Sequence, residues 1–260
     1  MLNVMPSMLK DAMSERSRSS LETAGFRVRL GRVTFQRYCV IGLSGTGSAT
    51  HPTRFSRAHY LAHPTMDLKP SQLPGMSELL SPEEARDMDR LVPIQQFKKG
   101  TVLLKAGDVA TASWFCIEGC VHMYYDVDGD LRTTEFYTEG QPVASLYSFI
   151  NQVPANHYLA CVEDSTLVVW TYAAERELFG KYPNLESSCR VSIESDFGEH
   201  QERMASLLTR TPEQRYLDLM EQRPDLLQRV PQYLLASYLG VTPESLSRIR
   251  KRIVSKETAR

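Results

Sequence analysis

The feature that most constrains the fold of this chain is a twenty-residue segment near its C-terminus. Residues 232–251 read QYLLASYLGVTPESLSRIRK, with apolar side chains at the spacing of two short helices joined by a tight turn. Ala236 lies where such helices cross closely, and Gly240 lies where the turn requires a positive φ. Thr242 is expected to cap the second helix, and Pro243 suits its first position. The pattern predicts a helix-turn-helix with Leu235, Leu239, Val241, Leu246 and Ile249 buried.

The polar face of the second predicted helix carries residue types that read DNA. Arginine can pair with guanine through two hydrogen bonds, and glutamate can accept a hydrogen bond from cytosine. The N-terminal part of such a helix enters the major groove of double-stranded DNA. An ordinary helical hairpin with a solvated basic end is the alternative. The candidate DNA-binding residues are Thr242, Glu244, Ser245, Ser247, Arg248, Lys251 and Arg252.

Charge is spread unevenly along the chain, although the formal net charge is only -1. Residues 1–65 carry 9 basic and 3 acidic side chains, residues 66–199 carry 10 and 21, and residues 200–260 carry 11 and 7. An acidic middle followed by a basic end favours a sensing or binding body joined to a part that faces nucleic acid.

Composition excludes several classes of protein. No apolar run reaches the roughly 18 residues that a membrane-spanning helix needs, and the first 30 residues lack the pattern of a secretory signal. We therefore expect no membrane partner. The five cysteines are odd in number and scattered, which favours reduced thiols in the cytoplasm over a disulfide framework.

Short segments rich in β-type residues fill the middle of the chain. Turns that contain glycine separate them, and such spacing predicts a small antiparallel roll or barrel. Before them, Ser81 and Pro82 have the residue types that begin a helix. The predicted strands are Thr101–Lys105, Trp114–Ile117, Val121–Val127, Arg132–Tyr137 and Leu167–Thr171.

Beyond Pro183 the apolar period becomes helical, and a seam with spacings of 4, 3, 4 and 3 continues for about two heptads. This helix either packs on its own domain or pairs with a second copy of the chain, and its polar opposite face favours the symmetric dimer. His200 on the seam is expected to pack or bridge rather than to bind a metal. The seam consists of Ile193, Phe197, His200, Met204 and Leu207.

The chain is therefore expected to have an α+β fold in four parts. Residues 1–75 are rich in Arg, Ser, Thr, Gly and Pro and predict a flexible, disordered extension. Residues 76–183 are assigned to an antiparallel β-roll that is similar to effector-binding domains, and residues 184–210 to a long dimerisation helix. Residues 211–260 are assigned to the helix-turn-helix domain.

Taken in order, these motifs resemble the Crp/Fnr family of bacterial transcription regulators. FKKGTVLLKAGD (97–108) and WFCIEGCVHMYY (114–125) are similar to early roll strands of the family, and EDSTLVV (163–169) is similar to its last strands. With the helix-turn-helix, the resemblance covers about residues 78–254. It implies a cyclic-nucleotide-binding-like roll, a homodimer and binding to double-stranded DNA, with RNA polymerase as a further partner.

The resemblance also indicates what the roll lacks. Family members that bind cyclic AMP hold it with a Gly-Glu pair and, further along, an Arg-Ser pair, because a buried phosphate needs a positive partner. Here Ala144 and Ser145 stand in place of Gly-Glu, Asn156 and His157 lie where the arginine is expected, and residues 133–175 contain no Lys or Arg. We expect a degenerate pocket, with Ser145, Asn156 and His157 as candidate contacts for an unknown effector, or no effector at all.

Two other chemistries of the family lack their residues as well. An iron–sulfur cluster needs about four cysteine ligands, whereas only Cys39 precedes the roll, and Cys116 and Cys120 are expected to be buried thiols. His122 or His157 alone does not predict a haem. No cofactor and no metal are expected.

The helix that would read DNA departs less from the family. Members that read a guanine-containing half-site use a Glu and an Arg four positions apart, and Glu244 and Arg248 match those positions. The family's usual arginine just before that Glu is replaced by Pro243, which cannot donate a hydrogen bond. The half-site should therefore differ from that of the cyclic AMP receptors.

These features favour a homodimeric, sequence-specific transcription regulator without enzymatic activity. A ligand sensor or scaffold that uses the same roll and does not bind DNA is the alternative. A cupin-like enzyme is a third class, but it needs clustered His and Glu ligands, and residues 97–170 contain no H-x-H or H-x-x-x-H motif. No catalytic residue is assigned.

Overall fold

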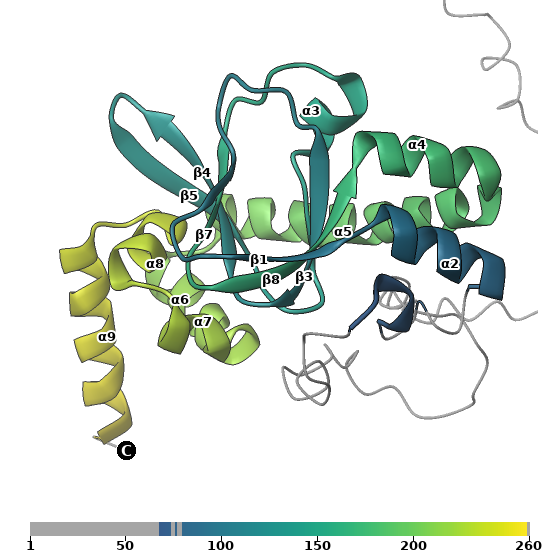
Figure 1. The fold of residues 1–260 in the computed structure, drawn as a ribbon. Helices are drawn as coiled ribbons and strands as arrows, with labels where there is room; N and C mark the ends of the chain where they lie inside the picture. Colours follow the sequence, from purple (N-terminus) through teal and green to yellow (C-terminus); the bar gives the residue numbers. More distant parts are fainter. Residues whose placement is uncertain (1–67, 74–75, 77–79, 259–260) are drawn as a thin grey trace, which may run out of the picture. The chain divides into compact units, whose positions relative to one another are not determined.

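Eight strands form two antiparallel sheets in the part of the chain that the computed structural model describes, residues 68–73, 76 and 80–258 (Figure 1). The side chains of residues 188–196, 199, 257 and 258 also lie outside that description. The strands are β1 (Ile94–Phe97), β2 (Val102–Leu104), β3 (Ala112–Glu118), β4 (Val121–Val127), β5 (Asp130–Tyr137), β6 (Pro142–Val143), β7 (Tyr158–Cys161) and β8 (Ser165–Thr171). One sheet has the order β1-β8-β3-β6, and the other has the order β2-β7-β4-β5.

The predicted roll is confirmed, and all five predicted strands are present. β4 has the expected ends, whereas the other four differ by one or two residues at one or both ends. The strands β1, β6 and β7 were not predicted from the β-type pattern, because they are only two to four residues long. Such short segments give no alternation that can be distinguished from a loop.

The core of the roll lies between the two sheets. Trp114 and Leu167 come from one sheet, Met123 and Leu159 come from the other, and all four belong to one buried cluster. In β3 the buried residues mostly alternate with half-buried ones, as expected for a strand with one face toward a core. Leu159 is fully buried, so its truncation to alanine is expected to cost about 2–5 kcal/mol of stability.

The turn between β3 and β4 requires a glycine. Gly119 has a φ of 115°, and a Cβ at this position would lie 2.3 Å from Ser165 Oγ and 2.6 Å from Ser165 Cα. No side chain fits so close to the backbone at the start of β8. The turn between β3 and β4 is therefore packed closely against the start of β8.

Helices follow and flank the roll. Ser81 and Thr211 cap their helices with reciprocal hydrogen bonds to Glu84 and Gln214, and the helix start expected at Ser81 and Pro82 is confirmed. Among the described residues, no helix is long and apolar enough to cross a membrane. The helices are η2 (Pro70–Gln72, 3-10), α2 (Pro82–Leu91), α3 (Leu146–Asn151), α4 (Tyr172–Lys181), α5 (Pro183–Thr209), α6 (Pro212–Gln222), α7 (Pro224–Arg229), α8 (Gln232–Tyr238) and α9 (Pro243–Thr258).

The helices α2 and α4 lie beside each other (Figure 1). Met88 and Leu178 are buried in a cluster that also contains Ile117 and Val168 of the roll. Exposed ion pairs accompany this contact, such as Arg90 with Glu177 at 2.8 Å. Such exposed pairs contribute little, so the apolar cluster holds the two helices.

The end of the predicted flexible extension differs from the expectation. Residues 1–67, 74 and 75 lie outside the described residues, but residues 68–73 are ordered. Leu73 is 5% exposed, and Ser71 donates to Asp89 of α2 through both its N–H (3.0 Å) and its hydroxyl (2.9 Å). The expected boundary at residue 75 is therefore too late, because a turn of helix before it packs against α2.

The predicted helix-turn-helix consists of α8 and α9. Gly240 has a φ of 67°, and Ala236 is fully buried where the helices cross, both as expected. Leu235, Leu246 and Ile249 are buried in one cluster with residues of α6 and α7. The chain thus builds a second apolar core after α5.

Candidate nucleic-acid interface

The helix α9 has one apolar and one polar face. Leu246, Ile249 and Ile253 are 1%, 5% and 6% exposed and anchor the helix in its domain. The predicted DNA-binding residues lie on exposed surface, apart from Ser245, which is half-buried. The exposed ones are Thr242, Glu244, Ser247, Arg248, Lys251 and Arg252.

The first turn of α9 is fixed by its cap. The Ser245 N–H donates to Thr242 Oγ1 at 3.3 Å, and the two hydroxyls are 3.2 Å apart. Ser245 therefore belongs to the cap rather than to the exposed face. The pKa of Glu244 is lowered mainly by a hydrogen bond from its own backbone N–H, and further by the Thr242 hydroxyl and the Arg248 charge. Glu244 thus stays ionised and acts only as an acceptor.

Arg215 joins α9's domain to the end of the long helix. It donates to the carbonyl oxygens of Leu207 at 3.2 Å and Arg210 at 2.7 Å, where α5 ends. It also donates to the Leu239 carbonyl, at 2.7 Å from Nη2, where α8 ends. Sequence reasoning missed this residue, because its partners are carbonyl groups, which leave no trace in the pattern of side chains.

The apolar seam of α5 is exposed in a single chain. Phe197, Met204 and Leu207 are 63%, 54% and 42% exposed, and the side chain of Ile193 lies outside the described residues. Leu208 is 85% exposed and extends the same face, eleven residues after Phe197. It was missed because the predicted seam continued from Met204 by three residues to Leu207, whereas a spacing of four leads to Leu208.

His200 differs from the other seam residues. Its Nδ1 lies 3.3 Å from Oε2 of the buried Glu135 in β5, and Arg203 Nη2 lies 3.0 Å from the same oxygen. The expectation that His200 bridges is consistent with this contact, but its partner is the roll of its own chain. The place of His200 in a dimer seam stays a prediction.

The candidate effector residues differ in burial, because Ser145 and His157 are buried whereas Asn156 is exposed. Ser145 is 2% exposed with a hydroxyl that has no hydrogen-bond partner, and His157 is 8% exposed with an unpartnered Nε2. Burial lowers the pKa of His157, which favours its neutral form. Asn156 is exposed and reaches His157 Nδ1 at 3.1 Å, and its role as an effector contact stays a prediction.

Apolar side chains form the central cluster between the two sheets of the roll. Trp114, Phe149 and Leu167 belong to this cluster. A cyclic phosphate would find no positive partner there, and burying it unpaired would be costly.

Comparison with known proteins confirms the resemblance. Residues 94–182 match the model of the cyclic nucleotide-binding domain. The chain has the Crp/Fnr fold. A comparison with curated protein sequences gives no match.

Three solved structures illustrate the shared fold. The c-di-GMP responsive global regulator CLP of Xanthomonas campestris has a TM-score of 0.56 and 17% identity, covering 68% of this chain and 93% of CLP. FixK2 of Bradyrhizobium japonicum gives 0.53 and 16%, covering 64% and 86%. A CooA variant of Carboxydothermus hydrogenoformans gives 0.51 and 12%, covering 64% and 78%. At such identities the Crp/Fnr fold is shared, whereas the ligand of each regulator remains its own property.

Three described cysteines of this Crp/Fnr-fold chain are buried thiols. Cys116 and Cys120 are fully buried, as expected, and Cys161 is 2% exposed. Burial raises the pKa of Cys120 to about 12 and also raises the pKa of Cys116. These thiols are therefore unreactive while their surroundings stay folded.

Proposed function

We propose that this chain is a sequence-specific, DNA-binding transcription regulator of the Crp/Fnr type. The observation that carries the proposal is the exposed face of α9, on which Glu244 and Arg248 lie one helical turn apart, opposite a buried apolar stripe. Glutamate and arginine at this spacing can read two neighbouring base pairs in the major groove.

We infer a homodimer as the form that binds DNA. Phe197, Met204 and Leu208 expose a continuous apolar stripe on α5, which water does not favour. Pairing two copies of α5 covers the stripe and presents two copies of α9 to a palindromic site. RNA polymerase as a further partner and a cytoplasmic location complete the proposal.

The proposed regulator does not use cyclic AMP. Its roll has an apolar interior, and Ser145 and His157 are the only members of the expected pocket that are buried. Two uncharged groups cannot replace the arginine that a cyclic phosphate requires. The effector is accordingly either an uncharged small molecule or absent.

Selection of binding sites from random double-stranded DNA tests the function. The expected result is one palindromic sequence that is bound tightly in low salt and still preferred in higher salt. DNA binding with no preferred sequence would contradict base reading by α9. No binding at either salt concentration would favour the alternative, a ligand sensor or scaffold without a role on DNA.

A further inference from the structure

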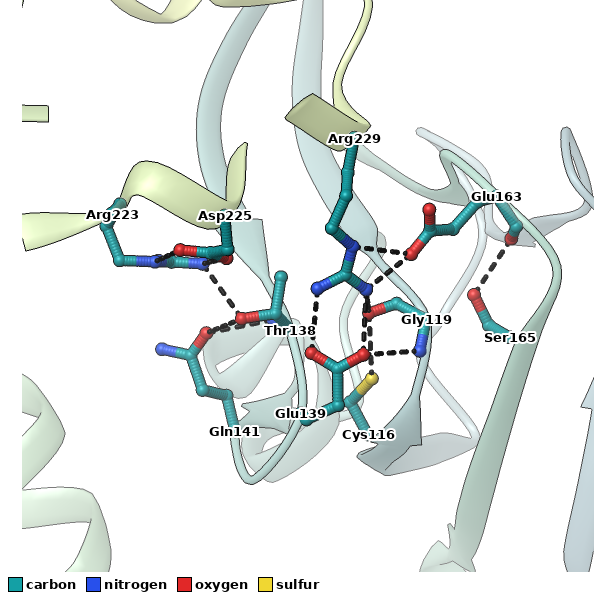
Figure 2. Close-up of polar contacts among 10 residues, drawn as sticks. All are labelled: Cys116, Gly119, Thr138, Glu139, Gln141, Glu163, Ser165, Arg223, Asp225 and Arg229. Atoms are coloured by element: carbon teal, nitrogen blue, oxygen red, sulfur yellow. Dashed lines mark hydrogen bonds and ion pairs between the residues drawn. The ribbon is translucent and has the colours of Figure 1, made fainter. Parts of the chain in front are cut away.

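A single arginine of the helix-turn-helix domain binds three turns of the roll. Arg229, the last residue of α7, donates to both carboxylate oxygens of Glu139, at 2.8 Å from Nη1 and 2.7 Å from Nη2. Its Nε donates to Glu163 Oε1 at 3.0 Å, and its Nη2 donates to the Gly119 carbonyl at 2.7 Å. Figure 2 shows the guanidinium between the two carboxylates, with Gly119 beside them. We call these four residues the Arg229 clasp.

The partners of Arg229 come from different turns of the roll. Gly119 lies between β3 and β4, Glu139 lies between β5 and β6, and Glu163 lies between β7 and β8. The Gly119 N–H also donates to Glu139 at 3.1 Å, so two of these turns are joined directly. One side chain thus ties α7 to strands of both sheets.

The clasp is largely removed from water. The side chains of Arg229, Glu139 and Glu163 are 14%, 7% and 31% exposed. Burial would raise the pKa of Glu139, but the hydrogen bonds from Arg229 and from backbone N–H groups keep it below its ordinary value. Removing one partner of such a group leaves the other charge buried and unpaired, which is strongly destabilising.

An apolar contact adjoins the clasp. Cys120, Phe136 and Val162 of the roll are buried in the same cluster as the core of the helix-turn-helix domain. The Phe136 ring meets the Tyr238 ring edge-on, with 5.2 Å between centroids. Cys120 is fully buried, so its access to solvent reports whether the two parts are in contact.

Two polar contacts extend the interface. Ser237 of α8 accepts a hydrogen bond from the Thr133 N–H at 2.9 Å and donates to the Leu131 carbonyl at 3.0 Å. Arg223 donates to the Thr138 hydroxyl at 2.9 Å, next to Glu139 (Figure 2). The contact therefore involves the loop before α7, the end of α7 and part of α8.

The DNA-reading face takes no part in this contact. Glu244, Arg248 and Lys251 are all exposed while the clasp is closed. The clasp and DNA consequently do not compete for the same side chains.

We propose that the Arg229 clasp is an orientation lock, which holds the helix-turn-helix domain against the roll of its own chain with α9 free for DNA. The inference rests on the proposed function. A palindrome requires two reading helices about 34–36 Å apart. If the helix-turn-helix domain rotated freely, the two reading helices would lose this separation, and the affinity for the operator would fall. Binding to unrelated DNA would remain, because it depends on phosphate contacts that do not require this separation.

Arg229→Met in the full-length chain tests the lock, because it removes the charge and keeps a long apolar side chain. The first readout is alkylation of Cys120 by N-ethylmaleimide, resolved by peptide mass, with Cys116 as an internal reference inside the roll. The second is binding to the selected palindrome and to unrelated DNA. Arg90→Met is the matched control, since Arg90 forms an exposed pair with Glu177.

An orientation lock predicts faster alkylation of Cys120, unchanged Cys116, and operator binding weakened at least about fivefold with unrelated DNA bound as before. The control should match the wild type in both readouts. Unchanged Cys120 protection would overturn the claim that the clasp holds the domains together. Tighter operator binding by Arg229→Met would overturn the claim that the clasp favours DNA binding, because the clasp would then hold the helix-turn-helix domain away from DNA.

Loss of folding is distinguishable from loss of the lock, because Cys116 and Cys120 would then be alkylated together. In that case the Glu163→Gln variant tests the lock instead. The Glu163 side chain is 31% exposed, and the substitution removes one charge of the clasp while keeping the shape of the side chain. Partial exposure of Cys120 alone is expected, and full protection would contradict the lock. If the wild-type chain binds no DNA, the proposed function fails, while the Cys120 readout still tests the clasp.

Discussion

Glu213 of α6 pairs with Arg252 of the reading helix, with 3.3 Å between Glu213 Oε2 and Arg252 Nε. The other carboxylate oxygen lies 2.8 Å from Lys256 Nζ. The hydrogen bond from Lys256 is the main reason that the pKa of Glu213 is lowered. Arg252 was predicted to contact phosphate, so it must leave or share this carboxylate when DNA binds. One acidic side chain thus reduces the positive charge that α9 offers to DNA.

Glu213→Gln is expected to strengthen binding to all DNA sequences. It frees two cations, and each new phosphate contact should steepen the dependence of log K on log salt by about 0.9. Titrations at several salt concentrations measure the slope. Glu221→Gln removes the same charge from an exposed position of the same helix and should change the slope less. Equal slopes for the two variants would mean that neither Arg252 nor Lys256 reaches the phosphate backbone of DNA.

Arg248→Ala is expected to abolish preference at one base pair of each half-site. It removes a bidentate contact with guanine, worth roughly 1–3 kcal/mol per half-site. Arg252→Ala should instead weaken binding to all sequences and lower the salt slope by about one. Site selection with each variant separates the two roles. If both variants select the wild-type sequence, Arg248 binds phosphate, and our assignment of the reading face is wrong.

Phe197→Glu is expected to separate the proposed dimer. Two carboxylates would face each other in the seam without a partner, which should raise the dissociation constant about a hundredfold or more. Sedimentation should report a monomer with weak operator binding. Ser187→Glu, on the exposed first part of α5 and outside the seam, should remain a dimer. An unchanged dimer in Phe197→Glu would place the interface elsewhere.

Cyclic AMP is expected not to bind the roll tightly. The corresponding pocket has no positive side chain to pair with the phosphate, and apolar residues such as Trp114 and Phe149 fill the interior. Calorimetry at millimolar nucleotide should show no saturable heat. Micromolar affinity would show that the phosphate is held by residues outside the stretch from Gly140 to Ala160.

Local rules predicted the parts of the fold that depend on neighbouring residues. The start of a helix at Ser81 and the positive φ of Gly240 follow from a few adjacent side chains, and each is confirmed. The β-type residues of β3, β4 and β5, bounded by turns that contain glycine, likewise predicted their strands. Each of these features needs only interactions within a short stretch of chain.

Contacts between distant segments could not be predicted in this way. Arg229 lies 90 residues from Glu139 and 66 from Glu163, and nothing near it distinguishes it from other arginines of the chain. His200 fitted a helical spacing, but a buried glutamate on β5 determines where its ring lies. Asn156 fitted an alignment of motifs, although its side chain points to solvent. Periodicity identifies a face and leaves open which element covers it.

His122 is expected to make the roll less stable as the pH falls below neutrality. Its ring is 8% exposed and stacks on Tyr124 at 4.7 Å, and burial lowers the pKa of His122 from 6.5 to about 4. The unfolded chain therefore takes up a proton below pH 6.5, whereas the folded chain does so only near pH 4. Stability from this group is complete above pH 6.5 and decreases by about 3 kcal/mol as the pH falls to 4.

Urea unfolding of wild type and His122→Phe between pH 7.5 and pH 4 measures this effect, because the phenylalanine keeps a buried ring and removes the proton site. As the pH falls, the wild type should lose more unfolding free energy than the His122→Phe variant. The effect of carboxylates, which titrate in both chains, cancels in this difference. A constant difference between wild type and His122→Phe would mean that the His122 ring is protonated in the folded roll, which its apolar surroundings oppose.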